Sequence, residues 1–283
     1  MLNNDLILSD RKPAMIIKSP RKRNHHCGPL HAVRAKLRNW YAVGLGRRVL
    51  DAERAELDSV LCNLFGFHLL QVGVYADEYL LGATRISHRI ILDREAHTLS
   101  AELQALALGG SAGALPIASH SVDVVLLHHS LEFSADPHQV LREIDRVLVP
   151  EGHVVIVGFN PWSCWLPWRW VLRWRKQPPW CGRALGSARL KDWLSLLSFD
   201  VVYGKYFFFR PPLHHHGIMD RLTLLERLGA RLWPVFGASF ILVGRKRVIA
   251  LTPIKPRWKP RRSLIPHGIA EPQSSEQKRC PPL

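Results

Sequence analysis

The stretch LPIASHSVDVVLLHHSLEFSADPHQVLREIDRVLVPEGHVVIVGF, residues 115–159, decides the fold class of this chain. It contains two continuous apolar runs, VDVVLLHH at 122–129 and HVVIVGF at 153–159, which are typical of buried parallel strands. Between them, DPHQVLREIDRVL at 136–148 places its apolar side chains on one helical face and carries Pro137 in its first turn. The stretch therefore predicts a strand–helix–strand unit.

The same alternation continues on both sides of this unit. Apolar, β-prone runs predict further strands at 68–75, 89–92, 199–209 and 239–247. Helical spacing predicts helices over 47–65 and 95–108, and the start of another over 79–86. Alternating strands and helices predict an α/β domain with a mostly parallel sheet, whose ligands bind at the carboxyl ends of the strands.

Composition excludes several other classes of protein. The chain has 283 residues, of which 47% are hydrophobic and 22% charged, so wholesale disorder and a small disulfide scaffold are excluded. The five cysteines are scattered and form no C-x-x-C pair, so neither a zinc site nor a disulfide framework is indicated. The N-terminus carries Asp5, Asp10 and Pro13 where a signal peptide needs an apolar core, and no apolar run reaches ~20 residues. We therefore expect a cytoplasmic protein.

The net charge of +16 is unevenly distributed along the chain. Residues 1–38 carry 9 basic and 2 acidic side chains, residues 245–283 carry 10 and 2, and residues 162–191 carry 7 and none. The remainder is therefore acidic, with a net charge of −6. We expect ordered structure from near Leu37, with basic disordered tails at 1–36 and 253–283 around one domain at 37–252.

Two residues at strand ends indicate a nucleoside-containing cofactor. Gly73 follows the first strand and supplies a tight turn that lets the backbone approach a ligand. Asp93 ends the second strand, 20 residues later, where a carboxylate can accept the hydroxyls of a ribose. No phosphate-binding glycine pattern and no Gly-Lys-Ser/Thr occur, so NAD, FAD and nucleoside triphosphates are not indicated.

Residues 115–159 closely resemble class I SAM-dependent methyltransferases, in particular the methyltransferase type 11 group. The resemblance rests on Leu115-Pro116-Ile117, Ser121-Val122-Asp123, the segment His128–Glu132, Asp136-Pro137, and the helix end RVLVPEG at 146–152. With the first two strands it spans residues 67–159. It implies a Rossmann-like fold, a seven-stranded mostly parallel sheet with an antiparallel last strand, and helices on both faces.

The resemblance also implies a SAM site. The residues it assigns to cofactor binding are Gln71, Gly73, Tyr75, Asp93, Leu115, Pro116, His128 and Ser130. Gly73 and its neighbours would cradle the methionine part, Asp93 would hold the ribose, and the segment after His128 would flank the methyl group.

The first motif departs from the family pattern of acidic-x-Gly-x-Gly-x-Gly. Gln71 replaces the acidic residue, and Tyr75 and Asp77 replace the second and third glycines. Two functions therefore stay open. The chain is either an active methyltransferase for a small-molecule or lipid-like acceptor, or a catalytically degenerate relative that acts as a basic module binding membranes or nucleic acid.

Methyl transfer from a sulfonium requires alignment of nucleophile, methyl and sulfur, and a general base only when the acceptor is protonated. The candidates for proton transfer are His128, His129 and Glu132. The alternative is that one histidine caps the strand while the other faces solvent. No metal ligand set is expected, because His214-His215-His216 is interpreted as a loop.

Six of the ten tryptophans lie in residues 162–180, inside a segment at 162–190 inserted after the fifth strand. Pro167 is expected to open a short helix there. The segment is interpreted as a lid on the core, as a peripheral membrane contact at the inner face of a bilayer, or as a nucleobase-stacking surface, in that order. Tryptophans lining the approach to the site predict an apolar or amphipathic acceptor.

Overall fold

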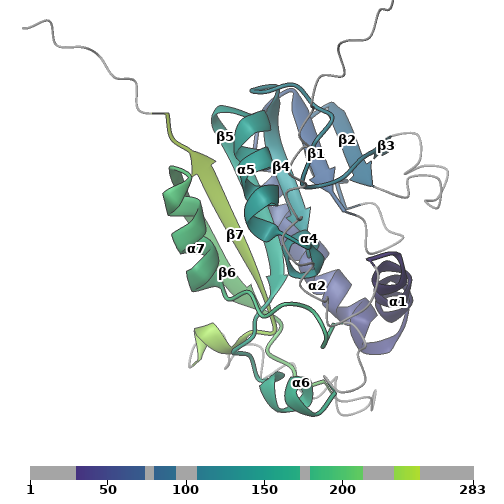
Figure 1. Ribbon diagram of the computed structural model, residues 1–283. Coiled ribbons are helices and arrows are strands. Elements are labelled where there is room, and N and C mark those ends of the chain that lie inside the picture. The colour runs from purple at the N-terminus through teal and green to yellow at the C-terminus, as the bar shows by residue number, and fades with distance from the viewer. Residues whose placement is uncertain (1–29, 74–79, 94–106, 173–178, 213–232, 249–283) are drawn as a thin grey trace, which may run out of the picture. The chain divides into compact units, whose positions relative to one another are not determined.

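A computed structural model describes residues 30–73, 80–93, 107–172, 179–212 and 233–248. Its centre is a seven-stranded sheet in the order β3-β2-β1-β4-β5-β7-β6 (Figure 1). The strands are β1 His68–Val72, β2 His88–Asp93, β3 Ala107–Gly109, β4 Val122–His128, β5 Leu148–Phe159, β6 Phe199–Phe207 and β7 Ser239–Lys246. Strand β7 is antiparallel to both of its neighbours and the other pairs are parallel. The predicted fold is confirmed.

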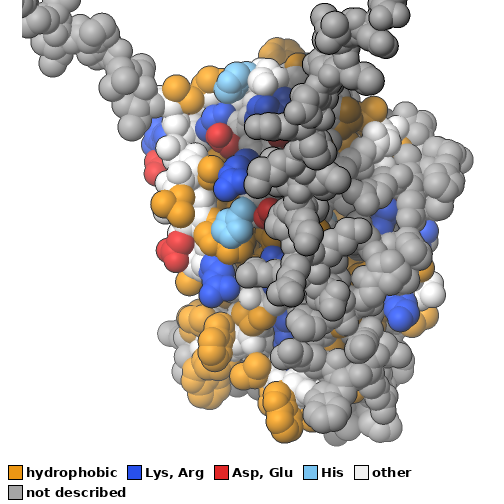
Figure 2. Space-filling model, in the orientation of Figure 1, with side chains coloured by type: hydrophobic (Ala, Val, Ile, Leu, Met, Phe, Trp, Pro, Cys, Tyr) orange, Lys and Arg blue, Asp and Glu red, His pale blue; other side chains and the backbone are white. Residues whose placement is uncertain are grey.

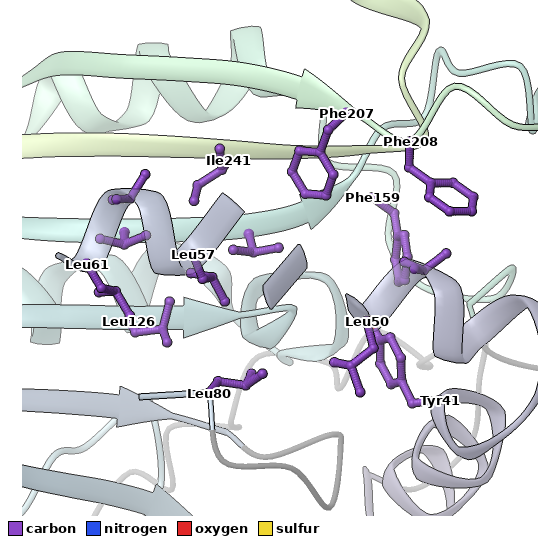
Figure 3. Packing of buried hydrophobic residues seen from close by; sticks show 14 of the residues in the cluster. Tyr41, Leu50, Leu57, Leu61, Leu80, Leu126, Phe159, Phe207, Phe208 and Ile241 are labelled. Carbon is purple, nitrogen blue, oxygen red and sulfur yellow. The ribbon is translucent and has the colours of Figure 1, made fainter. Parts of the chain in front are cut away.

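Helices cover both faces of the sheet (Figure 1). They are α1 Leu30–Ala42, α2 Gly44–Leu61, α4 Ser130–Phe133, α5 Pro137–Val147, α6 Leu166–Leu172 and α7 Ser187–Leu196, with a 3₁₀ turn η3 at Pro234–Phe236. Figure 3 shows Leu57 and Leu61 of α2 beside Leu126 of β4 and Ile241 of β7. Helices α5 and α7 bury their apolar faces in a second cluster on the opposite face.

The middle of the sheet explains the continuous apolar runs of the sequence. Strand β1 pairs with both β2 and β4, and six of the seven residues of β4 are buried. A parallel strand covered by helices on both faces has no solvent side, so its sequence does not alternate. The parallel pairing also brings the carboxyl ends of β1, β2 and β4 to one edge of the sheet.

Local chemistry sets the boundaries of α5. The carboxylate of Asp136 accepts the backbone N–H groups of His138 and Gln139, at 3.1 and 3.2 Å, and so caps the helix. Pro137 occupies the first turn, where no intrahelical N–H bond is lost. These features confirm the prediction of a helix over 136–148.

Some predicted elements differ from the structure. Helix α1 begins at Leu30, before the expected start of ordered structure near Leu37, because α1 packs against α2. The expected helix start over 79–86 is wrong, since residues 80–87 form turns that bury Leu80, Leu81 and Ile86 in the core. The last two residues of the expected helix 95–108 belong to β3, which pairs with β2 at the sheet edge.

Other expectations fall outside the described residues, including most of the helix at 95–108, the histidine triplet at 214–216 and the tail at 253–283. Across the described ranges, no helix has the length and apolar character needed to cross a membrane. Cys181 is disulfide-bonded, whereas Cys62 and Cys164 are free. The sequence indicates no disulfide framework, and its scattered cysteines gave no signal for the bond at Cys181.

Candidate active site

The site lies at the edge of the sheet where β1, β2 and β4 end. Gly73 follows β1 in a left-handed conformation, with φ of +82°, which favours glycine. Its N–H donates to the carbonyl of Leu92 at 3.0 Å, so it lies beside the residue that precedes Asp93. The buried amide of Gln71 donates to the carbonyl of Gly73 at 3.3 Å and steadies the turn. Two of the predicted cofactor residues, Gly73 and Asp93, are thus brought together.

Asp93 is buried and pairs with a residue that the sequence did not suggest. Arg34 of α1 forms an ion pair with the Asp93 carboxylate, and both side chains are almost fully excluded from solvent. A buried carboxylate needs such a partner because burial disfavours its charge. A ribose bound here would therefore share Asp93 with Arg34.

Leu115 and Pro116 precede β4 and are held by α5. The Leu115 N–H donates to Glu143 at 3.0 Å, and its carbonyl accepts from Arg146 at 2.9 Å. The hydrogen bond from Arg146 is the largest cause that lowers the pKa of Glu143. Leu115 is buried while Pro116 is exposed. Arg146 and Glu143 thus fix the wall of the site that Leu115 forms.

Ser130 begins α4, directly after β4, and its buried hydroxyl donates to the carbonyl of Val72. This bond ties the end of β4 to the end of β1. Tyr75, the remaining predicted cofactor residue, lies outside the described residues.

The three predicted catalytic residues meet around a fourth, Glu53 of α2. His128 Nε2 lies 2.9 Å from one oxygen of Glu53, and His129 Nε2 lies 2.9 Å from the other. On its far side, His129 Nδ1 lies 3.0 Å from Glu132. Both histidines are buried, so the alternative in which one of them faces solvent is wrong.

Hydroxyl and backbone donors complete this cluster. The hydroxyls of Tyr41 and Ser239 donate to the two Glu53 oxygens at 3.3 and 3.1 Å, so each oxygen accepts two bonds. The second oxygen of Glu132 accepts the backbone N–H of Phe159. We refer to Glu53, His128, His129 and Glu132 as the His/Glu cluster.

Burial and charge set the protonation of the His/Glu cluster. Burial alone would raise the pKa of Glu53, but the charge on His129 and hydrogen bonds from both histidines outweigh it and lower the pKa to about 2. Burial alone would lower the pKa of His129, but Glu53 and Glu132 outweigh it and raise the pKa to about 10. Burial lowers the pKa of His128. At neutral pH, Glu53 is therefore negative, His129 positive and His128 neutral.

The neutral state of His128 determines which of its nitrogens holds the proton. Glu53 is ionised and can only accept, so His128 Nε2 must carry the hydrogen that it donates. The lone pair is then on Nδ1, which is buried and has no hydrogen-bond partner among the described residues. The cluster thus presents one unused basic nitrogen.

A cation could in principle use the same atoms. Glu53, His128 and His129 each offer a ligand atom, and these atoms lie within 4.8 Å of one another. Each histidine would have to offer a deprotonated Nε2 to a metal. Without a metal, Glu53 and Glu132 raise the pKa of His129, and these residues form a proton network.

Aromatic side chains connect the His/Glu cluster with a surface hollow. The ring of His129 stacks on Phe159 at 4.0 Å, and Phe159 stacks in turn on Trp165 at 6.4 Å. The residues lining this aromatic hollow are Phe159, Asn160, Ser163, Trp165, Arg169, Pro179, Trp180 and Ala238. The hollow and the cluster therefore share Phe159.

Sequence reasoning missed Glu53, Arg34 and Tyr41, and one signal could have found Glu53. In the helix predicted over 47–65, Glu53 lies three and four residues from the core positions Leu50 and Leu57. A carboxylate in the middle of an apolar stripe is buried with the stripe and must find partners.

Comparisons with known proteins identify the family of the domain. Residues 72–156 match the family model described as a methyltransferase domain. The chain is 35% identical over 213 residues to the uncharacterized protein YafS of Escherichia coli K12, which covers 75% of this chain and 82% of that protein.

Solved structures share the fold at low sequence identity. A Haloferax volcanii protein solved in complex with the Trm112 methyltransferase activator has a TM-score of 0.51 at 19% identity, covering 76% of this chain and 98% of that chain. A SAM-dependent methyltransferase of Thermotoga maritima has a TM-score of 0.48 at 20% identity, covering 71% and 97%. The family match shows that the chain belongs to the methyltransferases, and the solved structures share its class I fold.

Proposed function

We propose that this enzyme transfers the methyl group of SAM to an apolar or amphipathic small molecule, and that His128 removes the proton of the acceptor. The observation that carries the proposal is the unpartnered, buried Nδ1 of a neutral histidine at the carboxyl end of β4. A general base must be unprotonated and within reach of the reacting group.

The residues at the sheet edge fit SAM. Bound SAM supplies a methyl group already activated by its sulfonium. Gly73 offers a turn at which the backbone can approach a ligand, and Asp93 offers a buried carboxylate for the ribose hydroxyls. Arg34 forms an ion pair with that carboxylate and orients it. Leu115 provides an apolar wall beside them.

Glu53 prepares His128 for proton transfer. Its carboxylate accepts the Nε2 proton and so directs the lone pair of Nδ1 away from Glu53. When Nδ1 takes a proton from the acceptor, the adjacent negative charge stabilises the imidazolium that forms, as in other carboxylate–histidine pairs. His129 is already protonated between Glu53 and Glu132, so it positions Glu53 and does not act as a base.

The aromatic hollow marks the proposed entrance for the acceptor; it has room for about one water molecule, so an acceptor must displace part of its lining. Phe159, Trp165 and Trp180 give it a largely apolar wall, while Asn160 and Arg169 add polar groups at the same hollow. Pockets of this composition bind apolar bodies and use a few polar groups for orientation. Phe159 lines the hollow and stacks on His129, which supports an approach of the acceptor beside the His/Glu cluster.

Calorimetry with SAM and its demethylated product tests the cofactor site. We expect Asp93→Ala to weaken binding by about tenfold or more, because a lost hydrogen bond to a charged group is worth roughly 1.5–3 kcal/mol. Asp200→Ala is the control, since Asp200 is exposed and forms an ion pair with Arg247 at the surface. Wild-type protein that binds neither compound would instead support the non-catalytic binding module.

Transfer of labelled methyl from SAM to molecules extracted from cells tests the base. His128→Gln keeps a donor toward Glu53 but removes the basic nitrogen, so labelling should fall by about 10²–10⁴-fold while SAM affinity is unchanged. His138→Gln is the matched control, because His138 is exposed at the start of α5. Full labelling by the His128→Gln variant would show that no base acts at this position.

A further inference from the structure

Large apolar side chains are exposed around α6 and η3. We refer to Trp162, Trp168, Trp170, Trp233, Val235 and Phe236 as the aromatic surface. Trp170 is 75% exposed and Trp233 is 60% exposed, although tryptophan is usually well covered in folded proteins. Contiguous exposed apolar patches on a folded protein mark sites of interaction.

The two parts of the aromatic surface are far apart in sequence but joined in the structure. The side-chain amide of Asn160 donates to the carbonyls of Val235 and Gly237, at 2.6 and 2.9 Å. The N–H of Cys164 donates to the carbonyl of Phe236 at 3.2 Å. Figure 2 shows hydrophobic side chains gathered at the end of the molecule where Figure 1 shows α6 and η3.

Charge adds a second, independent observation. No Asp or Glu occurs in residues 152–191, the stretch that contains α6. This stretch carries 7 Lys and Arg residues, among them Arg169 of α6. Basic side chains near an apolar surface are attracted to anionic lipid headgroups, and an acidic residue there would oppose docking.

We propose that the aromatic surface docks on an anionic lipid bilayer. Indole rings are favoured at the boundary between headgroups and acyl chains, because the ring is apolar and its N–H is polar. Helix α6 has seven residues, so it can lie at this boundary but cannot span it. Val235 and the exposed aliphatic neighbours Leu166 and Val171 also suit acyl chains, and they offer no face on which a nucleobase could stack.

Docking through this surface adds a route for the acceptor, a consequence that rests on the proposed function. Helix α6 carries Arg169 at the aromatic hollow and Trp170 on the aromatic surface. The hollow and the docked surface therefore adjoin through one helix, and an amphipathic acceptor would reach the hollow from the bilayer.

Co-sedimentation of the full chain with vesicles tests the docking. We expect the wild-type protein to bind vesicles of phosphatidylcholine mixed with phosphatidylglycerol more strongly than vesicles of phosphatidylcholine alone. The double variant Trp170→Ala/Trp233→Ala should bind the mixed vesicles with an affinity reduced by about tenfold or more. Each large apolar side chain stabilises the docked state by leaving water for the bilayer interface. Phe67→Ala is the matched control, since Phe67 is also 75% exposed but lies before β1, away from the carboxyl edge.

The outcomes separate this surface from the basic tails. The double variant keeps every charge of the chain, so unchanged binding of the mixed vesicles would assign the attraction to charge elsewhere and overturn the proposal. Failure of the wild-type protein to bind any vesicle would also overturn it. Binding of single-stranded RNA that the double variant loses, without vesicle binding, would replace the bilayer with nucleic acid. Calorimetry with SAM on the same variants measures the affinity of the cofactor site independently of vesicle binding. The docking proposal and the proposed methyltransferase function can therefore fail separately.

Discussion

Replacing Glu53 by glutamine tests whether charge holds the His/Glu cluster together. The substitution keeps the size of the side chain and removes its negative charge. Glu53 accepts ring N–H groups from both His128 and His129, so a glutamine must direct its own NH₂ group at one of them. That histidine then loses its acceptor, and the charge of His129 is balanced by Glu132 alone.

The pKa values give the expected size of the effect. The pKa of Glu53 falls from 4.5 to about 2 in the folded protein, which corresponds to roughly 3 kcal/mol of stability. The pKa of His129 rises from 6.5 to about 10, which corresponds to roughly 5 kcal/mol. The two numbers describe the same interaction and do not add. We expect Glu53→Gln to lower the free energy of unfolding by about 3–5 kcal/mol, as for other broken buried pairs.

The pH dependence has a definite sign. Because the folded pKa of His129 is raised, its contribution is complete below pH 6.5 and is lost as the pH rises toward 10. Because the folded pKa of Glu53 is lowered, its contribution is complete above pH 4.5 and is lost as the pH falls toward 2. Burial of neutral His128 also costs stability below pH 6.5, where the unfolded chain protonates it. The stability of this cluster therefore peaks near pH 6.5.

Urea unfolding followed by circular dichroism, between pH 6.5 and 10, measures both effects. The wild-type protein should lose stability across this range, and Glu53→Gln should lose much less. Glu56→Gln is the control, because Glu56 lies on the same helix and pairs with Lys205 near the surface, so its loss should cost less than about 1 kcal/mol. A Glu53→Gln variant as stable as Glu56→Gln, with the wild-type slope against pH, would refute the assigned charges.

Two further predictions concern the fold. Asp136→Ala removes the cap of α5 and should lower the free energy of unfolding by about 1 kcal/mol, measured by urea unfolding, whereas Asp136→Asn should largely preserve it. Leu126→Ala opens a cavity between β4 and α2 and should cost about 2–5 kcal/mol. A smaller cost, near that of an exposed site such as Leu196→Ala, would contradict the packing shown in Figure 3.

The sequence predicts the parts of the fold that local pattern determines. Strands β4 and β5 are long apolar runs, and α5 carries its own cap, so each can be located from adjacent residues. Strand β3 has three residues and none of them is buried, because it forms the sheet edge. Such a short exposed strand has no pattern of its own and depends on its pairing with β2.

The candidate site is predicted only in part, for a related reason. His128, His129 and Glu132 follow a strand end and can be proposed from their place in the sequence. The expectation that a histidine reaches solvent failed because Glu53, 75 residues away, makes burial of both rings favourable. Only packing of α2 on the sheet brings Glu53 there. The partner of Asp93, Arg34, likewise comes from α1, which precedes the segment 67–159 that resembles methyltransferases.

The His/Glu cluster and its hydrogen-bond donors come from distant parts of the sequence, which has a consequence for folding during synthesis. In the sequence of the domain, Tyr41 and Glu53 lie near the start, and Ser239 lies near the end, 186 positions beyond Glu53. The Ser239 hydroxyl can bond Glu53 only when β7 inserts between β5 and β6. Among the described strands, β7 is the last to be synthesised. Nascent chains that stop before β7 lack this donor, and high contact order of this kind slows folding. The His/Glu cluster is therefore completed only after β7 has been synthesised and paired with β5.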